Sequence, residues 1–327
     1  MDSKLLKNLG NMDQLCGIRE YDIDAGRGRG VHAAEVHTAA GLSFTVLPDL
    51  GMTIYDFRYR GINLTFHSKN GIVSPHGFSS SENEFAEQWT GGMLVTCGLE
   101  NVGEYCRDGG NCLTHGRLIS MPASSFGTEE HWERDDYVLR ITGEVHQTRM
   151  YGRHISLRRT IETSLFGKSI RIHDRLTNFT ETDEPYMLLY HCNFGYPLLS
   201  EESRVRVCDC QHHSRMNELA GDYRTMLKPV DGRGEELFMH SGFSDKAWAE
   251  LYNPSLKLGG FVRFSTRNLP NMVEWKNMKS HDYVLAFEPC NTYGINRVEA
   301  KEAGKIAVLP AYSTIDNELE IGVIEAN

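Results

Sequence analysis

Two polar side chains near the middle of the chain stand two residues apart between apolar stretches. In EPYMLLYHCNFGYPLLS, residues 184–200, His191 and Asn193 follow the apolar run 187–190. Residues two apart in a strand point to the same face of a sheet. A buried polar side chain costs free energy unless it finds a partner. We therefore expect either a local hydrogen-bond network or a strand face that lines a polar cavity.

Two further segments place an ionisable side chain next to apolar strand-like residues. His115 stands in CLTHGRLISMPA, where Gly116 would let the backbone approach a ligand and Arg117 would supply a fork of donors. Glu288 follows the apolar run of YVLAFEPCNTYG. A single residue of this kind is more often a satisfied core or edge residue. His115, His191 and Glu288 taken together predict an acid–base site without a nucleophile, with Arg117 and Asn193 at its wall.

Other chemistries find less support in the sequence. The segment Cys208–His213 (CDCQHH) concentrates soft ligands in Cys208, Cys210, His212 and His213, but no second ligand pair follows at zinc spacing, so we expect no metal. The chain has no G-x-S-x-G elbow and no G-x-x-x-x-G-K-[ST] loop. A glycosidase would need a second carboxylate facing Glu288, and the sequence singles out none.

The composition bounds the partners and the compartment. The chain has 327 residues, a net charge of -10 and 40% hydrophobic residues, which is typical of a globular protein. The acidic balance argues against a nucleic-acid partner, and no apolar run is long enough to span a membrane. Residues 1–16 lack the features of a signal peptide and predict a short amphipathic helix through Leu5, Leu9 and Met12. With eight scattered cysteines, we expect a cytoplasmic protein.

Period-2 alternation of apolar residues dominates the chain. It predicts a hairpin over 155–176 that turns at 166–168, and another over 42–61 that turns at 48–51. Further strands are expected over 137–143, 260–265, 283–287 and 305–309, and a short helix over 79–89 with Ser81 as its cap and Glu84 three residues later. We expect one mostly antiparallel all-β domain over residues 1–327, with long, many-stranded sheets and few short helices.

The order and spacing of five segments resemble a known family. LPDLGMTIYDFRYRGINLTF, WTGGMLVTCGLENVG, HGRLISMPA, YHCNFGYPLL and AFEPC are similar to the aldose 1-epimerase (mutarotase) superfamily, and more narrowly to its DUF4432-type branch. The resemblance runs from about residue 10 to the C-terminus. It implies the galactose-mutarotase-like β-supersandwich, which agrees with the predicted strands.

The resemblance also implies roles for individual residues. In mutarotases a histidine protonates the sugar ring oxygen and a glutamate deprotonates the anomeric hydroxyl. The family motifs match His191 as the acid, Glu288 as the base and His115 as a third catalytic residue. Sugar binding would fall to Arg117, Asn193, Asn101, His240 and Trp275, with Trp89 and Tyr196 as further aromatic candidates. Two departures, H-G-R for the usual H-G-G and CGLENVG in place of an arginine motif, indicate a different mode of sugar recognition.

The expected function is therefore interconversion of sugar anomers, in carbohydrate metabolism. Hemiacetal opening needs only proton transfers, so the chemistry requires no metal or redox cofactor, and the expected partner is a small-molecule sugar. The first alternative is a carbohydrate-binding domain without catalysis. The second is an epimerase that acts on a sugar phosphate, although no cluster of basic residues is evident beyond Arg117, Lys276 and Arg297. The sequence leaves the oligomeric state open, with a homodimer as one option.

Overall fold

The structure, a computed structural model, describes residues 6–77, 84–214, 221–292 and 296–326. Its N-terminal sheet is a meander of five antiparallel strands, which are β1 (Gly17–Asp22), β2 (His32–His37), β3 (Leu42–Leu47), β4 (Thr53–Tyr59) and β5 (Ile62–Asn63). The predicted hairpin over 42–61 is confirmed as β3 and β4, which the 3-10 helix η3 (Pro48–Leu50) connects.

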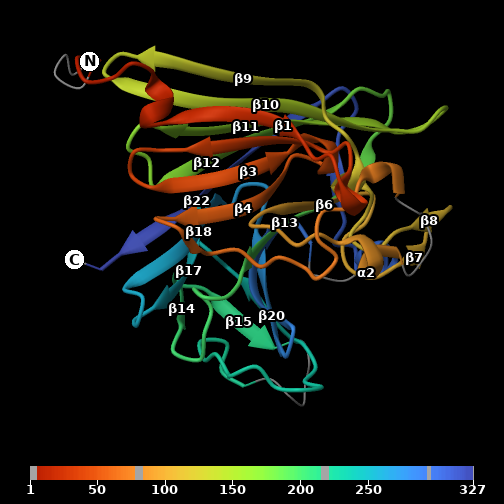
Figure 1. The fold of residues 1–327 in the computed structure, drawn as a ribbon. Coiled ribbons are helices and arrows are strands. Elements are labelled where there is room, and N and C mark those ends of the chain that lie inside the picture. The colour runs from red at the N-terminus through yellow and green to blue at the C-terminus, as the bar shows by residue number, and fades with distance from the viewer. Residues whose placement is uncertain (1–5, 78–83, 215–220, 293–295, 327) are drawn as a thin grey trace.

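A second sheet has eight strands and extends from the top of the molecule into its lower half in Figure 1. In spatial order it contains β14 (Arg204–Val207), β17 (Lys246–Asn253), β18 (Leu258–Ser265), β22 (Thr314–Glu325), β12 (Ser169–Asn178), β11 (His154–Ser164), β10 (Asp136–Thr148) and β9 (Ser124–Glu133). The predicted hairpin over 155–176 is confirmed as β11 and β12, with Ile161 opposite Ile172. Alternating burial along both strands follows from the period-2 pattern.

The third sheet has seven strands and carries the candidate chemistry. In spatial order it contains β15 (Gln211–Ser214), β16 (Glu236–Ser241), β19 (Asn271–Lys279), β20 (Asp282–Cys290), β13 (Glu184–Phe194) and β21 (Ala307–Leu309), with β6 (Val95–Leu99) also paired to β13. The short strands β7 (Cys106–Arg107) and β8 (Asn111–Cys112) form a separate hairpin. All the strand pairings within these sheets are antiparallel, as the sequence predicts for the fold class.

Helices are short in the described part of the chain. They are α2 (Glu84–Gln88), α3 (Arg297–Glu302) and the 3-10 helices η1 (Met12–Gln14), η2 (Gly26–Gly28), η4 (Pro75–Gly77) and η5 (Leu118–Ser120). Ser81, the predicted helix cap, lies outside the described residues, as do residues 1–5 of the predicted N-terminal helix. In the described part of that segment, Met12 of η1 packs against the core. No described helix is long and apolar enough to cross a membrane.

The sheets share one large cluster of buried apolar side chains, to which all three contribute. A polar network inside it connects the eight-stranded sheet to β13. The guanidinium of Arg159 donates to both oxygens of Asp174, at 2.8 and 2.6 Å, and both side chains are fully buried. The hydroxyl of Tyr190 donates to Asp174 at 2.8 Å. Because Tyr190 precedes His191, this network fixes the strand that carries the candidate acid.

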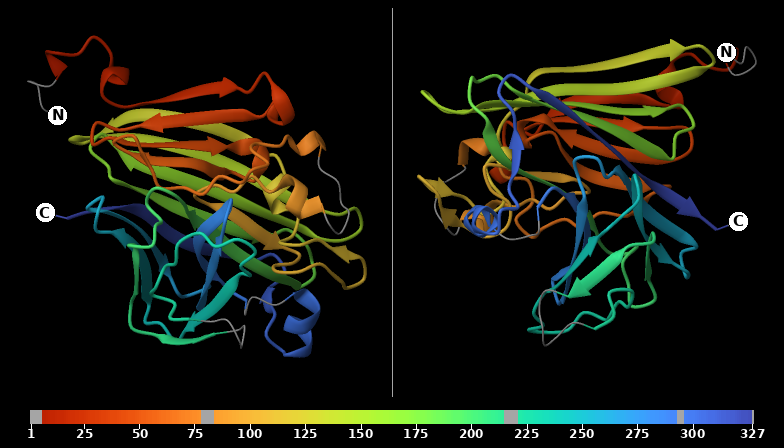
Figure 2. Two further views of the ribbon diagram at one scale, coloured as in Figure 1. Left: turned by 60° about the horizontal axis from the view of Figure 1, so that its bottom comes forward. Right: turned by 180° about the vertical axis from the view of Figure 1, so that it is seen from behind.

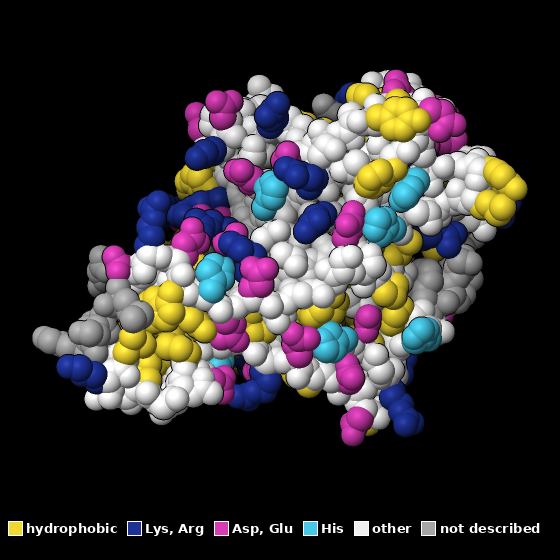
Figure 3. All heavy atoms as spheres, turned by 90° about the horizontal axis from the view of Figure 1, so that it is seen from above, with side chains coloured by type: hydrophobic (Ala, Val, Ile, Leu, Met, Phe, Trp, Pro, Cys, Tyr) yellow, Lys and Arg dark blue, Asp and Glu magenta, His cyan; other side chains and the backbone are white. Residues whose placement is uncertain are grey.

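The face seen from above carries both signs of charge. Lys and Arg side chains lie interspersed with Asp and Glu there (Figure 3). On the long strands, Arg140 pairs with Glu129 at 3.0 Å and with Glu162 at 3.4 Å. Exposed pairs of this kind contribute about 0–1 kcal/mol each. They give the outer face a mixed surface rather than a basic one.

Candidate active site

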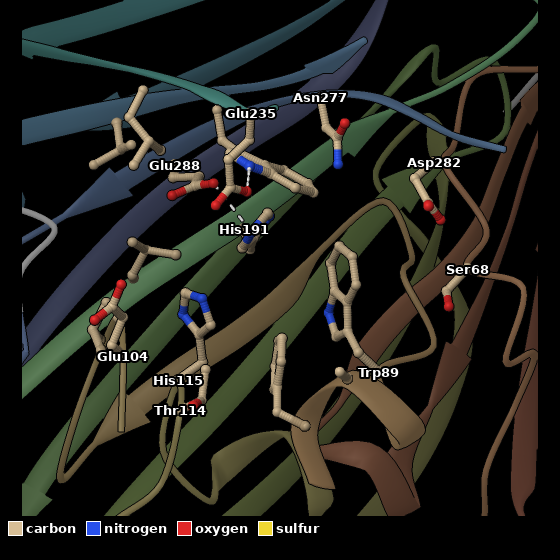
Figure 4. Close-up of a pocket in the computed structure, with 18 of the residues that line it drawn as sticks. Ser68, Trp89, Glu104, Thr114, His115, His191, Glu235, Asn277, Asp282 and Glu288 are labelled. Atoms are coloured by element: carbon tan, nitrogen blue, oxygen red, sulfur yellow. Dashed lines mark hydrogen bonds and ion pairs between the residues drawn. The ribbon is translucent and has the colours of Figure 1, made fainter. Parts of the chain in front are cut away.

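A pocket of about 760 Å³ opens over the seven-stranded sheet (Figure 4). Strands β13, β16, β19 and β20 supply its floor. Its walls come from the segment after β5, from α2, from the segment between β6 and η5, and from α3. Helix α3 packs beside the β7–β8 hairpin on this side of the molecule (Figure 2). The site therefore combines a floor of paired strands with walls of irregular structure.

His191 and Glu288 form a buried pair at the bottom of this pocket. Strands β13 and β20 pair with Leu189 opposite Cys290 and Cys192 opposite Phe287, a register that sets His191 opposite Glu288. Their side chains are directed toward each other in Figure 4, with His191 Nε2 3.1 Å from Glu288 Oε1. Only 6% of the His191 side chain and 5% of the Glu288 side chain are exposed. His191 Nδ1 is buried and has no partner among the described residues.

The electrostatics of the pair favour its uncharged form. Burial raises the pKa of Glu288 well above the usual value for a glutamate, and the carboxylate of Glu235 raises it further. Burial also lowers the pKa of His191 well below the usual value for a histidine, and nearby His115 lowers it further. Both shifts follow from the cost of a charge in a poorly solvated site. Both directions favour a protonated Glu288 beside a neutral His191.

His115 lies on the facing wall, on the segment between β6 and η5. Its backbone takes a positive φ of 55° and bonds to Gly98 and Gly103, which directs the ring into the pocket. The ring centroid lies 5.7 Å from that of His191 and 5.0 Å from that of Phe85. These surroundings desolvate the imidazole and lower its pKa to about 4. His115 is therefore neutral near pH 7, and its Nδ1 has no described partner.

Two tryptophans complete the aromatic surroundings of His191. Trp89 follows α2, and Trp275 lies on β19 opposite the small residue Ala286. Their rings lie 5.3 and 5.4 Å from the His191 ring, measured between centroids. The indole N–H of Trp275 donates to Glu235 at 2.6 Å, which fixes the orientation of this ring. The pocket thus offers apolar faces beside polar groups, as small-molecule sites do.

The structure places Asn193 and Gly116 differently from the sequence prediction. Asn193 is fully buried and does not belong to the pocket lining. Its amide donates to the carbonyl of Gly92 at 2.8 Å and to that of His191 at 3.0 Å. Gly116 approaches protein backbone rather than a ligand, since a Cβ there would lie 2.2 Å from the carbonyl oxygen of Gly98. Both residues shape the site from behind.

Arg117, Asn101 and His240 also lie outside the pocket lining, although the resemblance predicts that they bind the sugar. Arg117 pairs with Glu100 at 3.1 Å. Asn101 is fully buried and braces the pocket wall, since its amide donates to the carbonyls of Glu104 and Leu113 at 2.8 and 2.9 Å. His240 is fully buried against Glu274 at 3.1 Å. Each of these polar side chains has protein partners that account for it.

Two further candidates from the sequence also lie away from the pocket. Tyr196 is 73% exposed and does not line it. In the segment Cys208–His213, the Cys210 thiol lies 3.8 Å from His240 Nδ1, while the His212 ring packs on Tyr223. Within the described ranges, no three His, Cys, Asp or Glu side chains gather as a metal site would require.

Sequence reasoning missed several lining residues, which come mostly from irregular segments. They are Phe66, Ser68, Lys69, Phe85, Glu104, Glu235, Asn277, Asp282 and Glu299. Glu235 matters most, because it holds Trp275 and shifts the pKa of Glu288. It precedes β16 in a polar stretch, GRGEEL, where nothing distinguishes it from its neighbour Glu236. Only the spatial arrangement identifies it.

Comparisons with known proteins place the chain in a family. The family model described as "Domain of unknown function (DUF4432)" matches residues 28–323. No protein of curated function matches the sequence.

Solved structures share the fold. A proposed aldose 1-epimerase from Klebsiella pneumoniae superposes with a TM-score of 0.87 over 99% of this chain and 87% of its own, at 22% identity. A galactose mutarotase-like protein from Clostridium acetobutylicum superposes with a TM-score of 0.63 over 96% of this chain and 100% of its own, at 12% identity. The galactose 1-epimerase from Lactobacillus acidophilus superposes with a TM-score of 0.60 over 95% of this chain and 100% of its own, at 14% identity. The chain therefore belongs to the DUF4432 family and has the galactose-mutarotase-like β-sandwich fold.

Proposed function

We propose that the protein is an aldose 1-epimerase-like isomerase that interconverts the anomers of a sugar through ring opening. The observation that carries the proposal is the buried His191–Glu288 pair, 3.1 Å apart at the bottom of a pocket of about 760 Å³. The names of structural relatives agree with it, since they include aldose 1-epimerase and galactose mutarotase-like proteins. The pair offers one acid and one base, and each is typically worth about 10²- to 10⁴-fold in rate.

The reaction needs only these two groups. His191 as imidazolium gives a proton to the ring oxygen, and Glu288 as carboxylate takes the proton of the anomeric hydroxyl. The bond between C1 and the ring oxygen breaks while the C1 carbonyl forms, and no proton is gained or lost overall. After rotation about the C1–C2 bond, the same transfers run backwards on the other face and close the ring as the opposite anomer.

The uncharged resting pair sets the first step. A protonated Glu288 beside a neutral His191 is the proton distribution that follows ring opening, so a cyclic sugar needs the proton to cross from Glu288 to His191 first. Their direct contact at 3.1 Å allows that transfer. His115, neutral and on the facing wall, is suited to bind a sugar hydroxyl.

The same pair could act with the opposite polarity, directly from the resting state. Glu288 would then protonate the ring oxygen, and neutral His191 would take the anomeric proton. Both schemes carry the same number of protons, so a pH–rate profile does not separate them. A structure with a bound sugar does, because the acid is the group within hydrogen-bond distance of the ring oxygen.

The test is NMR exchange spectroscopy on a panel of free sugars, with each anomer watched for accelerated interconversion. The expected result is exchange that depends on enzyme concentration for at least one sugar and falls at least 100-fold in Glu288→Gln. Binding of a sugar without exchange would favour the alternative of a non-catalytic carbohydrate-binding domain. A preference for sugar phosphates would favour the second alternative, although Lys69 is the only Lys or Arg in the described lining.

A further inference from the structure

The lining of the pocket is strongly acidic. Among the described lining residues, five are carboxylates, namely Glu104, Glu235, Asp282, Glu288 and Glu299, against the single cation Lys69. Lys69 does not offset this excess, because its Nζ lies 2.8 Å from Asp282 Oδ1 and the two charges cancel. Glu288 shares its site with His191 as an uncharged pair. Glu104, Glu235 and Glu299 therefore leave the pocket with a net negative charge.

An independent feature of the same pocket favours a cationic ligand. The rings of Phe85 and Trp89 lie 5.8 Å apart, and those of Trp89 and Trp275 lie 5.9 Å apart, measured between centroids. Together they form an aromatic wall around His191, and aromatic faces attract ammonium groups. His191 lies at the bottom of this wall and is 4% exposed.

Glu235 stands where the acidic and aromatic features meet. It lies near the His191–Glu288 pair in Figure 4. One of its oxygens accepts the indole N–H of Trp275 at 2.6 Å. Its second oxygen has no hydrogen-bond partner within the part of the chain that the structure describes. A carboxylate held in this way can accept a charge-assisted hydrogen bond from a ligand at the face of the indole.

We propose that the preferred substrate is a sugar that carries a protonated amine, and that Glu235 with the Trp275 face binds this ammonium group. That this sugar is a substrate rests on the proposed function, whereas the preference for a positively charged sugar does not. Glu104, Glu235 and Glu299 are exposed residues of the lining, so their combined charge attracts cations and disfavours anionic sugars through an interaction that salt screens. Neutral sugars fall between the two.

Calorimetric titration of the full-length protein at pH 7 tests the charge preference. The ligands are D-glucosamine, D-glucose, D-glucose 6-phosphate and N-acetyl-D-glucosamine, which keeps the nitrogen but loses its charge. We expect D-glucosamine to bind about tenfold tighter than D-glucose and its N-acetyl derivative, and the phosphate to bind at least tenfold more weakly than D-glucose. The preference should shrink as salt is raised, because it is electrostatic.

Variants locate the preference. Glu235→Gln should reduce the ratio of the D-glucosamine and N-acetyl-D-glucosamine affinities to nearly one. Glu302→Gln removes the same charge from an exposed position of α3 outside the pocket lining and should leave the ratio unchanged. Equal affinity for the two ligands, or binding of the phosphate as tight as that of D-glucosamine, overturns the inference.

The two proposals fail separately. Catalysed anomer exchange without any amine preference overturns the charge inference and leaves the isomerase standing. A salt-dependent amine preference without exchange on any sugar supports the charge inference and overturns the isomerase.

Discussion

The described part of the chain contains two buried histidine–glutamate pairs with the same contact distance. His191 and Glu288 on β13 and β20 lie 3.1 Å apart, and so do His240 and Glu274 on the adjoining strands β16 and β19. Burial raises the pKa of both carboxyls. Only the first pair lines the pocket, and both side chains of the second pair are fully buried. A close acid–base pair with shifted pKa values is therefore not by itself evidence of an active site.

The difference lies in what surrounds each histidine. The second ring nitrogen of His240 has the Cys210 thiol at 3.8 Å, whereas that of His191 has no described partner. The ring of His191 lies among Trp89, Trp275 and His115 in a space that a ligand can enter. The ring of His240 packs on the ring of Tyr223, which packs in turn on the ring of Phe238. Access, rather than pairing, distinguishes the proposed catalytic pair from the structural one.

The largest expected effect is on catalysis. Glu288→Gln keeps the shape of the side chain but removes the base, so kcat for anomer exchange should fall by about 10²- to 10⁴-fold with a smaller change in KM. Glu274→Gln makes the same chemical change in the second pair and should leave kcat per folded molecule within about threefold of the original. NMR exchange rates on both variants provide the measurement. Equal losses in the two variants would contradict the assignment of roles.

The next-largest expected effect is on the free energy of unfolding. The loss should be larger for the His240–Glu274 pair than for the His191–Glu288 pair. His240→Ala leaves Glu274 buried without its partner, and breaking a buried pair of this kind costs about 3–5 kcal/mol. His191→Ala opens onto a pocket that water can fill, and the raised pKa of Glu288 favours its neutral form, so its cost should be smaller. Urea unfolding of both variants, followed by circular dichroism, measures the two free energies. A larger loss in His191→Ala would mean that this histidine is primarily structural.

The pKa of His115, lowered to about 4 by desolvation, predicts a pH effect on stability. Between pH 6.5 and about 4 the unfolded chain binds a proton at this histidine that the folded protein does not bind. Stability is therefore lost as the pH falls through this range, by at most about 1.4 kcal/mol per pH unit for one proton. His115→Asn should make the decline shallower, as unfolding midpoints at pH 7 and 4.5 would reveal. An unchanged pH dependence would show that the histidine titrates normally.

The smallest effect concerns the strand behind the catalytic pair. Asn193→Ala removes two amide hydrogen bonds, to the carbonyls of Gly92 and His191, and should destabilise the protein by about 1–2 kcal/mol. Because Asn193 does not line the pocket, KM should change little. Thermal unfolding and steady-state exchange rates test the two parts. A rise in KM without loss of stability would instead place its side chain in contact with the sugar.

Local patterns in the sequence account for much of the fold. Alternation over 155–176 predicts both strands of that hairpin and their buried faces, because the side-chain period of a strand is two. The strand predicted over 283–287 is longer in the structure, where β20 continues to Cys290 and includes Glu288. A carboxylate and a proline at the end of an apolar run look like a strand terminus, yet β20 continues through both, with Glu288 opposite Val273 and Pro289 opposite Met272.

The candidate site was harder to predict, because its geometry depends on contacts between distant segments. His191 and Glu288 meet through the register of two strands almost one hundred residues apart, which no local pattern specifies. Arg117 has a carboxylate partner, Glu100, that the sequence gives no reason to choose. Glu235 lies in a polar stretch without periodicity. The sequence therefore identifies residues with the right chemistry but cannot separate those that face the pocket from those that support it.

Asn101 has a consequence for the kinetics of ligand entry. Its carboxamide connects the backbone of Glu104 and Leu113 to that of Arg297, whose N–H donates to Asn101 Oδ1 at 2.8 Å. One side chain thus ties the wall that carries His115 to helix α3 before any ligand arrives. A wall ordered in advance loses little conformational entropy when a ligand binds. Association through this side of the pocket therefore needs no ordering step. The observed rate constant of binding should then rise linearly with ligand concentration, without a plateau.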